Sequence, residues 1–124
     1  MRVPVLKQGA CLVAVFQPGL TDAELLALRE DLSVRVGEHR ARGVVLDVTA
    51  LDLIDSFGAR TLRGIALALR LRGAETVLVG IQPDVAFAMA QLGLTLEGVD
   101  TALDLEEGTA LLSRRLAARR HNGR

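Results

Sequence analysis

Apolar residues in this 124-residue chain fall into two patterns that alternate along the sequence. Short, nearly continuous apolar runs are typical of strands with both faces covered, whereas apolar residues at i, i+3, i+4 and i+7 mark one face of a helix. Gln8 and Gly9 form a short polar connection between the first two runs, which indicates an N-terminal β-hairpin. The runs predict strands at residues 3–7, 10–16, 44–48, 76–81 and 99–103.

The helical pattern recurs after recognisable start signals. Thr21 and Glu24 form the T-x-x-E sequence of a capping box, which predicts a helix over residues 22–39. Pro at a first helical position and Gly after a last one are further boundary signals. They predict three more helices, which run from Ser56 towards Gly73, from Pro83 towards Gly93, and onward from the D-x-x-E of residues 104–107.

The alternation of strands and helices after the hairpin implies parallel strands joined by helical crossovers. We therefore predict an α/β fold with a mixed, mostly parallel sheet of about four or five strands and about four helices, which begins with the hairpin. No linker or repeat divides the sequence, so we expect one domain over residues 1–124. Residues 119–124 are expected to be a frayed tail, because chain ends with few apolar residues are often poorly ordered.

Composition excludes several classes of function. The chain has 15 Lys and Arg residues and 15 Asp and Glu residues, so its formal net charge is zero, whereas nucleic-acid-binding proteins normally carry a basic excess. No segment approaches the roughly 20 apolar residues that span a bilayer, and none has the pattern of a signal peptide, so we expect no membrane partner. Cys11 is the only cysteine, which rules out an internal disulfide and favours the cytoplasm.

The stretch 43–73 contains the residues that we expect to carry function. A buried strand there leads through an acidic loop to Ser56 at the start of a helix. The N–H groups of a first helical turn lack intrahelical partners and carry partial positive charge, so they stabilise a capping oxygen or an added phosphate. On residue types alone, the simpler interpretation is that Asp55 or Ser56 is only the N-cap. The alternative is that Ser56 is an exposed hydroxyl whose phosphorylation is a signal.

Patterns for catalysis and metal binding are missing from the sequence. His39 and His121 lack a metal-ligand spacing, and Ser56 lacks the G-x-S-x-G turn of hydrolases. No P-loop or dinucleotide fingerprint occurs. Carboxylates near Ser56 are better explained as strand-end, turn and capping residues than as Mg²⁺ ligands, because nothing nearby holds a phosphate. These carboxylates are Asp47, Asp52 and Asp55. We therefore predict no enzyme, no catalytic residue, no metal and no cofactor.

Several segments together resemble the STAS family, and within it the short RsbS-like scaffold proteins of bacterial stressosomes. They are V-P-V-L-K-Q-G at 3–9, V-V-L-D-V-T-A-L-D-L-I-D-S-F-G at 44–58, V-L-V-G-I-Q-P-D-V-A at 77–86 and G-V-D-T-A-L-D-L-E-E-G at 98–108. The resemblance covers residues 3–116. Gly58 departs from the family pattern, which has a bulkier residue there, and we expect a looser first helical turn because Gly is a poor helix former.

The resemblance implies a non-enzymatic regulator of a stress response. Its relatives are phosphorylated at the serine that matches Ser56 by an RsbT-like switch kinase, which they sequester in a large assembly with RsbR-like STAS proteins and release on phosphorylation. Self-association into dimers and larger assemblies is part of this expectation. The surface around Ser56 that would bind partners comprises Asp52, Asp55, Phe57, Gly58 and Arg60.

Four questions remain open on the sequence. Phe57 is either an exposed partner contact or a core residue, and Thr61 or Thr101 could be modified as well. A simple anti-sigma factor antagonist, which binds an anti-sigma kinase without a large assembly, would have the same fold. A small-ligand-binding or catalytic α/β domain would have a deep polar pocket near Asp47, Asp52 and Gly80, at the ends of the parallel strands, that holds a nucleotide or metal.

Overall fold

The computed structural model describes the backbone of residues 3–123 and the side chains of residues 3–119. Its centre is a five-stranded sheet in the order β1-β2-β3-β4-β5. The strands are β1 (Val5–Gln8), β2 (Cys11–Val15), β3 (Gly43–Asp47), β4 (Glu75–Val79) and β5 (Asp100–Ala102). β1 and β2 form an antiparallel hairpin, and every later pair of neighbours is parallel. The predicted mixed, mostly parallel sheet with an N-terminal hairpin is confirmed.

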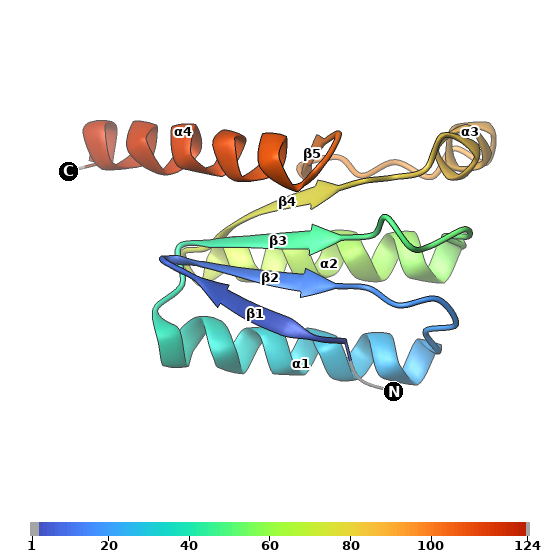
Figure 1. Ribbon diagram of the computed structural model, residues 1–124, viewed down its shortest axis with the longest axis horizontal. Coiled ribbons are helices and arrows are strands. Elements are labelled where there is room, and N and C mark those ends of the chain that lie inside the picture. Colours follow the sequence, from blue (N-terminus) through green and yellow to red (C-terminus); the bar gives the residue numbers. More distant parts are fainter. Residues whose placement is uncertain (1–2, 124) are drawn as a thin grey trace.

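Helices cover both faces of the sheet (Figure 1). They are α1 (Asp22–His39), α2 (Ser56–Leu71), α3 (Pro83–Gln91) and α4 (Leu105–Gly123). α1 and α2 lie on one face and α4 lies on the other, while α3 sits beyond the end of β4 (Figure 1). None of the helices in the described part of the chain is long and apolar enough to cross a membrane.

Local capping explains where two of these helices begin. The Thr21 hydroxyl accepts the N–H of Glu24 at 3.1 Å, and the Glu24 carboxylate accepts the N–H of Thr21 at 3.0 Å, which confirms the predicted capping box. Asp104 caps α4 by accepting the N–H of Glu107 at 2.8 Å. α4 continues to Gly123. The helix thus includes most of the segment 119–124, whose fraying remains a prediction, and residue 124 lies outside the described residues.

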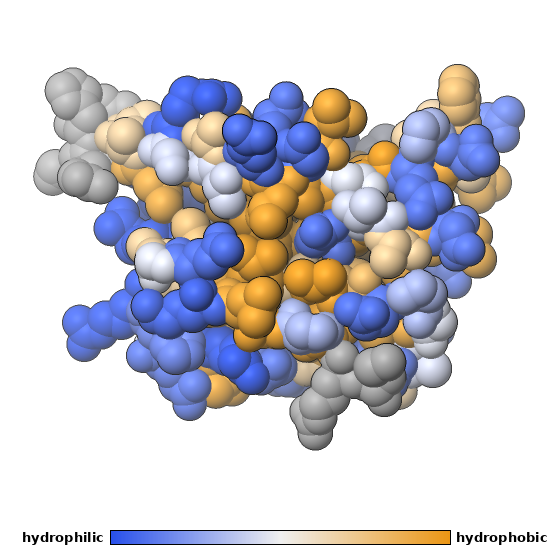
Figure 2. Space-filling model, in the orientation of Figure 1, coloured by the Kyte–Doolittle hydropathy of each residue, from blue (hydrophilic) through white to orange (hydrophobic). Residues whose placement is uncertain are grey.

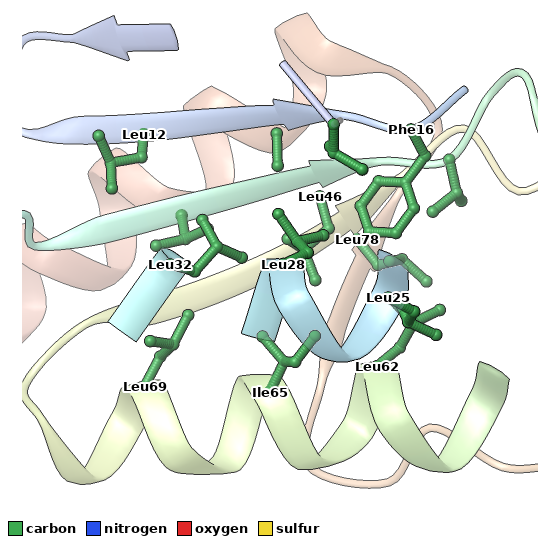
Figure 3. Close-up of a cluster of buried hydrophobic side chains, with 14 of the residues drawn as sticks. Leu12, Phe16, Leu25, Leu28, Leu32, Leu46, Leu62, Ile65, Leu69 and Leu78 are labelled. Atoms are coloured by element: carbon green, nitrogen blue, oxygen red, sulfur yellow. The ribbon is translucent and has the colours of Figure 1, made fainter. Parts of the chain in front are cut away.

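The larger hydrophobic core fills the space between the sheet and the helices α1 and α2. Side chains from the strands point down to meet leucines and an isoleucine of both helices (Figure 3). The labelled members of this core are Leu12, Phe16, Leu25, Leu28, Leu32, Leu46, Leu62, Ile65, Leu69 and Leu78. The buried residues of α1 recur every three or four positions and therefore share one face of the helix; they are Leu25, Leu28, Leu32 and Val36. This core holds the starts of α1 and α2 against the same edge of the sheet.

A smaller core lies on the opposite face, beneath α4. Side chains alternate between the two faces along a strand, so Leu12 enters the larger core while its neighbour Val13 enters the smaller one. Val13, Val45 and Val77 stand side by side across three strands and pack with Leu112 of α4. The continuous apolar runs of the central strands are therefore explained by helices on both faces.

Candidate functional site

Ser56 lies where the loop after β3 enters α2, at the edge of the sheet where the parallel strands end (Figure 1). The loop is anchored just before this point, because Ile54 is only 6% exposed and belongs to the larger core. Its neighbour Leu53 is 71% exposed, and Asp52, Asp55 and Ser56 are exposed as well. The buried side chain of Ile54 thus fixes the position of the exposed residues on either side of it.

Asp55 is the N-cap of α2. Its backbone is extended, with φ −86° and ψ −176°, and its Oδ1 accepts the N–H of Gly58 at 2.7 Å. Ser56 is therefore the first residue of the helix and does not cap it. Within the described residues, the exposed Ser56 hydroxyl has no hydrogen-bond partner. The sequence left open whether Asp55 or Ser56 caps the helix. In the structure Asp55 is the cap, so the Ser56 hydroxyl is not needed for capping.

The other residues of the predicted surface differ in exposure. Asp52 and Arg60 are exposed, whereas Phe57 is half-buried and packs against the larger core. A Cβ at Gly58 would lie 3.2 Å from Asp55 Oδ1 and 3.5 Å from Ile54 Cγ2. A bulkier residue at Gly58 would crowd the oxygen that caps the helix.

The first half of the loop after β3 is hydrogen-bonded to the segment that connects β4 with α3. Asp47 Oδ1 accepts both the N–H of Thr49, at 3.0 Å, and its hydroxyl, at 2.6 Å, which confirms a strand-end turn role for Asp47. Gln82 Nε2 donates to the Thr49 carbonyl at 2.7 Å. Gly80 has φ +82°, and a Cβ there would overlap the Thr49 hydroxyl, so only Gly fits this approach. These contacts connect the Ser56 loop with the start of α3.

Thr49 and Gln82 are missing from the sequence-based prediction of the site. A signal for Thr49 exists, because Asp followed two residues later by Thr at a strand end favours a side-chain-stabilised turn. Gln82 precedes Pro83, which marks it as a residue at a helix start, but its partner is 33 residues away in the sequence. Only the folded structure brings the two together.

A groove of about 280 Å³ lies beside the site, between the loops that precede α1 and α2. Apolar residues make up much of its lining, and Asp22, Asp52 and Asp55 contribute acidic residues to it. The ligand-binding alternative expected a polar pocket near Asp47, Asp52 and Gly80. Asp52 lines this groove, whereas Asp47 and Gly80 do not.

Of the two other candidate residues, Thr61 is half-buried, whereas Thr101 is exposed like Ser56. The Thr61 hydroxyl donates to the Phe57 carbonyl at 2.8 Å, so it is engaged within α2. Thr101 lies on β5. Among the described residues, no group of three or more His, Cys, Asp and Glu side chains is arranged to hold a metal ion.

Comparison with known proteins agrees with the fold. The family model of the STAS domain matches residues 3–108. The chain is 33% identical to the RsbT co-antagonist protein RsbRA of Bacillus subtilis over 115 residues, which are 86% of this chain. It spans 42% of the length of RsbRA and 29% of the length of RsbRC, another RsbT co-antagonist protein of the same organism.

Solved structures include chains of similar length. A serine-to-glutamate variant of RsbS from Moorella thermoacetica has a TM-score of 0.80 and 32% sequence identity, and the match covers 94% of this chain and 99% of that one. A chain from a structure of the stressosome, described as a signal integration and transduction hub, has a TM-score of 0.74 and 31% identity. That match covers 91% of this chain and 98% of the other.

Proposed function

This chain belongs to the STAS domain family, and we propose that it is a non-enzymatic, phosphorylatable scaffold of a bacterial stressosome that acts in the cytoplasm. In this proposal the unmodified protein sequesters an RsbT-like switch kinase in an assembly with RsbR-like STAS proteins. Phosphorylation of Ser56 releases the kinase and so regulates a stress response. Similarity to RsbS and to a stressosome chain over nearly the full length supports the scaffold, and the similarity to RsbRA supports RsbR-like partners.

The proposal rests on one observation. The Ser56 hydroxyl at the start of α2 is exposed and makes no hydrogen bond within the described residues. Because Asp55 caps the helix, phosphorylation of Ser56 would not remove a hydrogen bond that the fold needs. The phosphate would add about −1.5 to −2 charges beside the exposed carboxylates of Asp52 and Asp55. A partner docked on this surface would then face repulsion and a larger desolvation cost. A coupling of about 3 kcal/mol would lower its affinity roughly 150-fold.

Different residues of the partner-binding surface would contribute in different ways. Asp52, Asp55 and Arg60 are exposed and offer charges to a partner, whereas Phe57 packs against the core and holds the first turn of α2 in place. Gly58 leaves room for the Asp55 cap. The surface is thus formed by exposed charges on a rigid, capped helix start.

Phosphate mapping tests the proposal directly. The protein would be incubated with ATP and an RsbT-like switch kinase, and modified sites would be located by mass spectrometry. We expect phosphate on Ser56, none on a Ser56→Ala variant, and unchanged labelling of Thr61→Ala and Thr101→Ala. In a pull-down, Ser56→Ala should keep the kinase and Ser56→Asp should lose it. Full kinase capture by stoichiometrically phosphorylated protein would contradict the proposal.

The size of the complex separates the scaffold from an anti-sigma factor antagonist that acts alone. Mixed with an RsbR-like protein, a stressosome scaffold should elute in a megadalton-scale assembly on size exclusion with light scattering. An antagonist that binds only an anti-sigma kinase would give a small complex. The second outcome would reject the scaffold while leaving the Ser56 switch intact.

A further inference from the structure

Ser56 and Arg60 lie one turn apart on the outward face of α2. Arg60 is the fourth residue after Ser56, and both are exposed. Residues at this spacing are neighbours on a helix surface, with Cβ atoms about 5–6 Å apart. Long side chains of a helix also lean over the turn that precedes their own Cα. Helix geometry therefore directs the Arg60 side chain towards the turn that begins with Ser56.

No other group of the described chain holds Arg60. Within residues 3–119, its guanidinium forms neither an ion pair nor a hydrogen bond. Arg70, near the end of the same helix, instead donates to the Gly98 carbonyl at 2.7 Å. The residues of α2 include no Asp or Glu, and the carboxylate of Asp55 accepts the N–H of Gly58. The Arg60 guanidinium is therefore available to a new anion.

The outward face of α2 points away from the apolar surface of the molecule's other side. Figure 2 shows a hydrophobic band between α4 and α1, on the side where Figure 1 places β1 and β2 in front and α2 behind the sheet. The first two turns of α2 carry Ser56, Arg60 and Arg63, all exposed. A phosphate on Ser56 would stay in contact with water, so its pairing with Arg60 would have the modest strength of an exposed ion pair.

We propose that Arg60 binds the phosphate of phosphorylated Ser56 and is thereby withdrawn from partners of the unmodified surface. A guanidinium can donate two parallel N–H bonds to one phosphate, which a lysine ammonium cannot do. Arg63 is seven residues from Ser56 and lies about 10 Å further along the helix axis, compared with about 6 Å for Arg60. Phosphorylation thus changes two charges, because it adds about −1.5 to −2 charges and neutralises one positive charge beside them.

This ion pair rests on the function proposed above, since it requires phosphorylated Ser56, and it gives kinase release a second cause. In the unmodified protein, the free guanidinium of Arg60 can pair with a carboxylate of the partner. After phosphorylation the guanidinium is occupied, and the same carboxylate meets a phosphate of like charge. The partner that this surface fits is therefore one that presents an acidic residue to Arg60.

Phosphorus NMR measures the ion pair without the kinase. Phosphoserine would be installed at position 56 during translation, and the phosphorus signal would be titrated through the second pKa of the phosphate, which is ordinarily about 6. A nearby cation favours the dianion, so this pKa should be higher in Arg60→Gln than in the wild type, by roughly half a pH unit. The carboxylates of Asp52 and Asp55 and the guanidinium of Arg63 are present in both proteins, so the difference reports on Arg60.

Arg63→Gln is the matched control. It removes the same charge from an exposed arginine that also forms no ion pair within the described residues, but one that is two turns from Ser56. This variant should change the phosphate pKa far less, and Arg60→Lys should fall between the wild type and Arg60→Gln. The Nε–H signal of Arg60 should move when the phosphate is present, while that of Arg63 stays. Equal pKa values in the wild type and Arg60→Gln, or equal increases in Arg60→Gln and Arg63→Gln, would overturn the ion pair.

Kinase affinity tests the role of Arg60 in release. The dissociation constants of the modified and unmodified forms give one ratio for each protein. This ratio should be smaller by roughly threefold or more in Arg60→Gln than in the wild type, and unchanged in Arg63→Gln. Equal ratios in all three proteins would overturn the role of Arg60 in release. A kinase that leaves Ser56 unmodified would reject the proposed function, whereas NMR of the installed phosphoserine would still decide the ion pair.

Discussion

Substitutions of Asp55 can separate its capping role from its charge. The carboxylate accepts the Gly58 N–H at 2.7 Å and also lies directly before Ser56. Asp55→Ala removes both the acceptor and the charge, whereas Asp55→Asn keeps an oxygen acceptor and removes only the charge. Because Asn and Asp are about equally good N-caps, the two variants should differ in stability although both have lost the charge.

The expected magnitude follows from the exposed position of the cap. Loss of an N-cap acceptor lowers the free energy of unfolding by about 1 kcal/mol, within a range of about 0.5–2 kcal/mol. For a domain of this size, about 1 kcal/mol corresponds to a fall of about 3–6 °C in Tm. We expect this change for Asp55→Ala and less than about 0.5 kcal/mol for Asp55→Asn. Asp52→Ala is a control in the same exposed loop and should also stay below about 0.5 kcal/mol.

Urea and thermal unfolding, followed by circular dichroism, would measure these differences. Kinase binding by the same variants would then be measured in the pull-down. There, Asp55→Asn shows whether the charge of Asp55 contributes to kinase binding while the helix start stays intact. If Asp55→Ala is as stable as the wild type, the hydrogen bond to Gly58 does not stabilise α2. If Asp55→Asn is as unstable as Asp55→Ala, the carboxylate acts through its charge at the helix terminus and the capping argument is wrong.

Three further predictions concern the fold that holds the site. Gly80→Ala should destabilise the protein by about 2 kcal/mol or more, because of the positive φ and the overlap with Thr49, whereas Gly73→Ala, with φ +93° and no atom within 4 Å of its Cβ, should lose less in urea unfolding. Leu112→Ala should lose about 2–5 kcal/mol, because it leaves a cavity beneath α4, and a smaller loss would show that the helix collapses onto the sheet. Burial raises the pKa of the Cys11 thiol, so the folded state holds the proton more tightly than the unfolded chain. This contribution is fully present below the ordinary thiol pKa of about 8.5 and is lost as the pH rises through the folded pKa, so wild-type stability should fall more between about pH 7 and 10 than that of Cys11→Ala.

The hydrogen bond between the Ser56 loop and the residue before α3 bears on the proposed switch. Gln82 donates a hydrogen bond to Thr49 of this loop. Along the chain, Thr49 precedes the buried residue Ile54 and Ser56 follows it. A partner that moves the start of α3 would therefore act on the loop that carries Ser56. Phe87, in the middle of α3, is 73% exposed, so this helix presents an aromatic side chain to solvent.

Local sequence determined the elements of this protein and the place of Ser56 among them. The capping box at Thr21, the D-x-x-E before α4 and the Gln8-Gly9 connection act between residues close in sequence, so their structures could be predicted from the residues alone. Strand ends were less certain. β4 stops at Val79 although the apolar run continues to Ile81, because Gly80 turns away with a positive φ.

Tertiary structure decided which acidic or hydroxyl residue caps α2, and how the loop before it is held. Asp55 and Ser56 are both good capping residues, and the choice of Asp55 depends on the burial of Ile54, which sets the direction of the chain. The contact of Gln82 with Thr49 joins residues 33 positions apart in sequence. The place of β1 as an outer strand of the sheet likewise follows from the order in which the strands pair, which no local pattern gives. Local patterns indicate which residues form helices, strands and turns. These other features arise from packing between segments that are distant in sequence, so no short stretch of sequence predicts them.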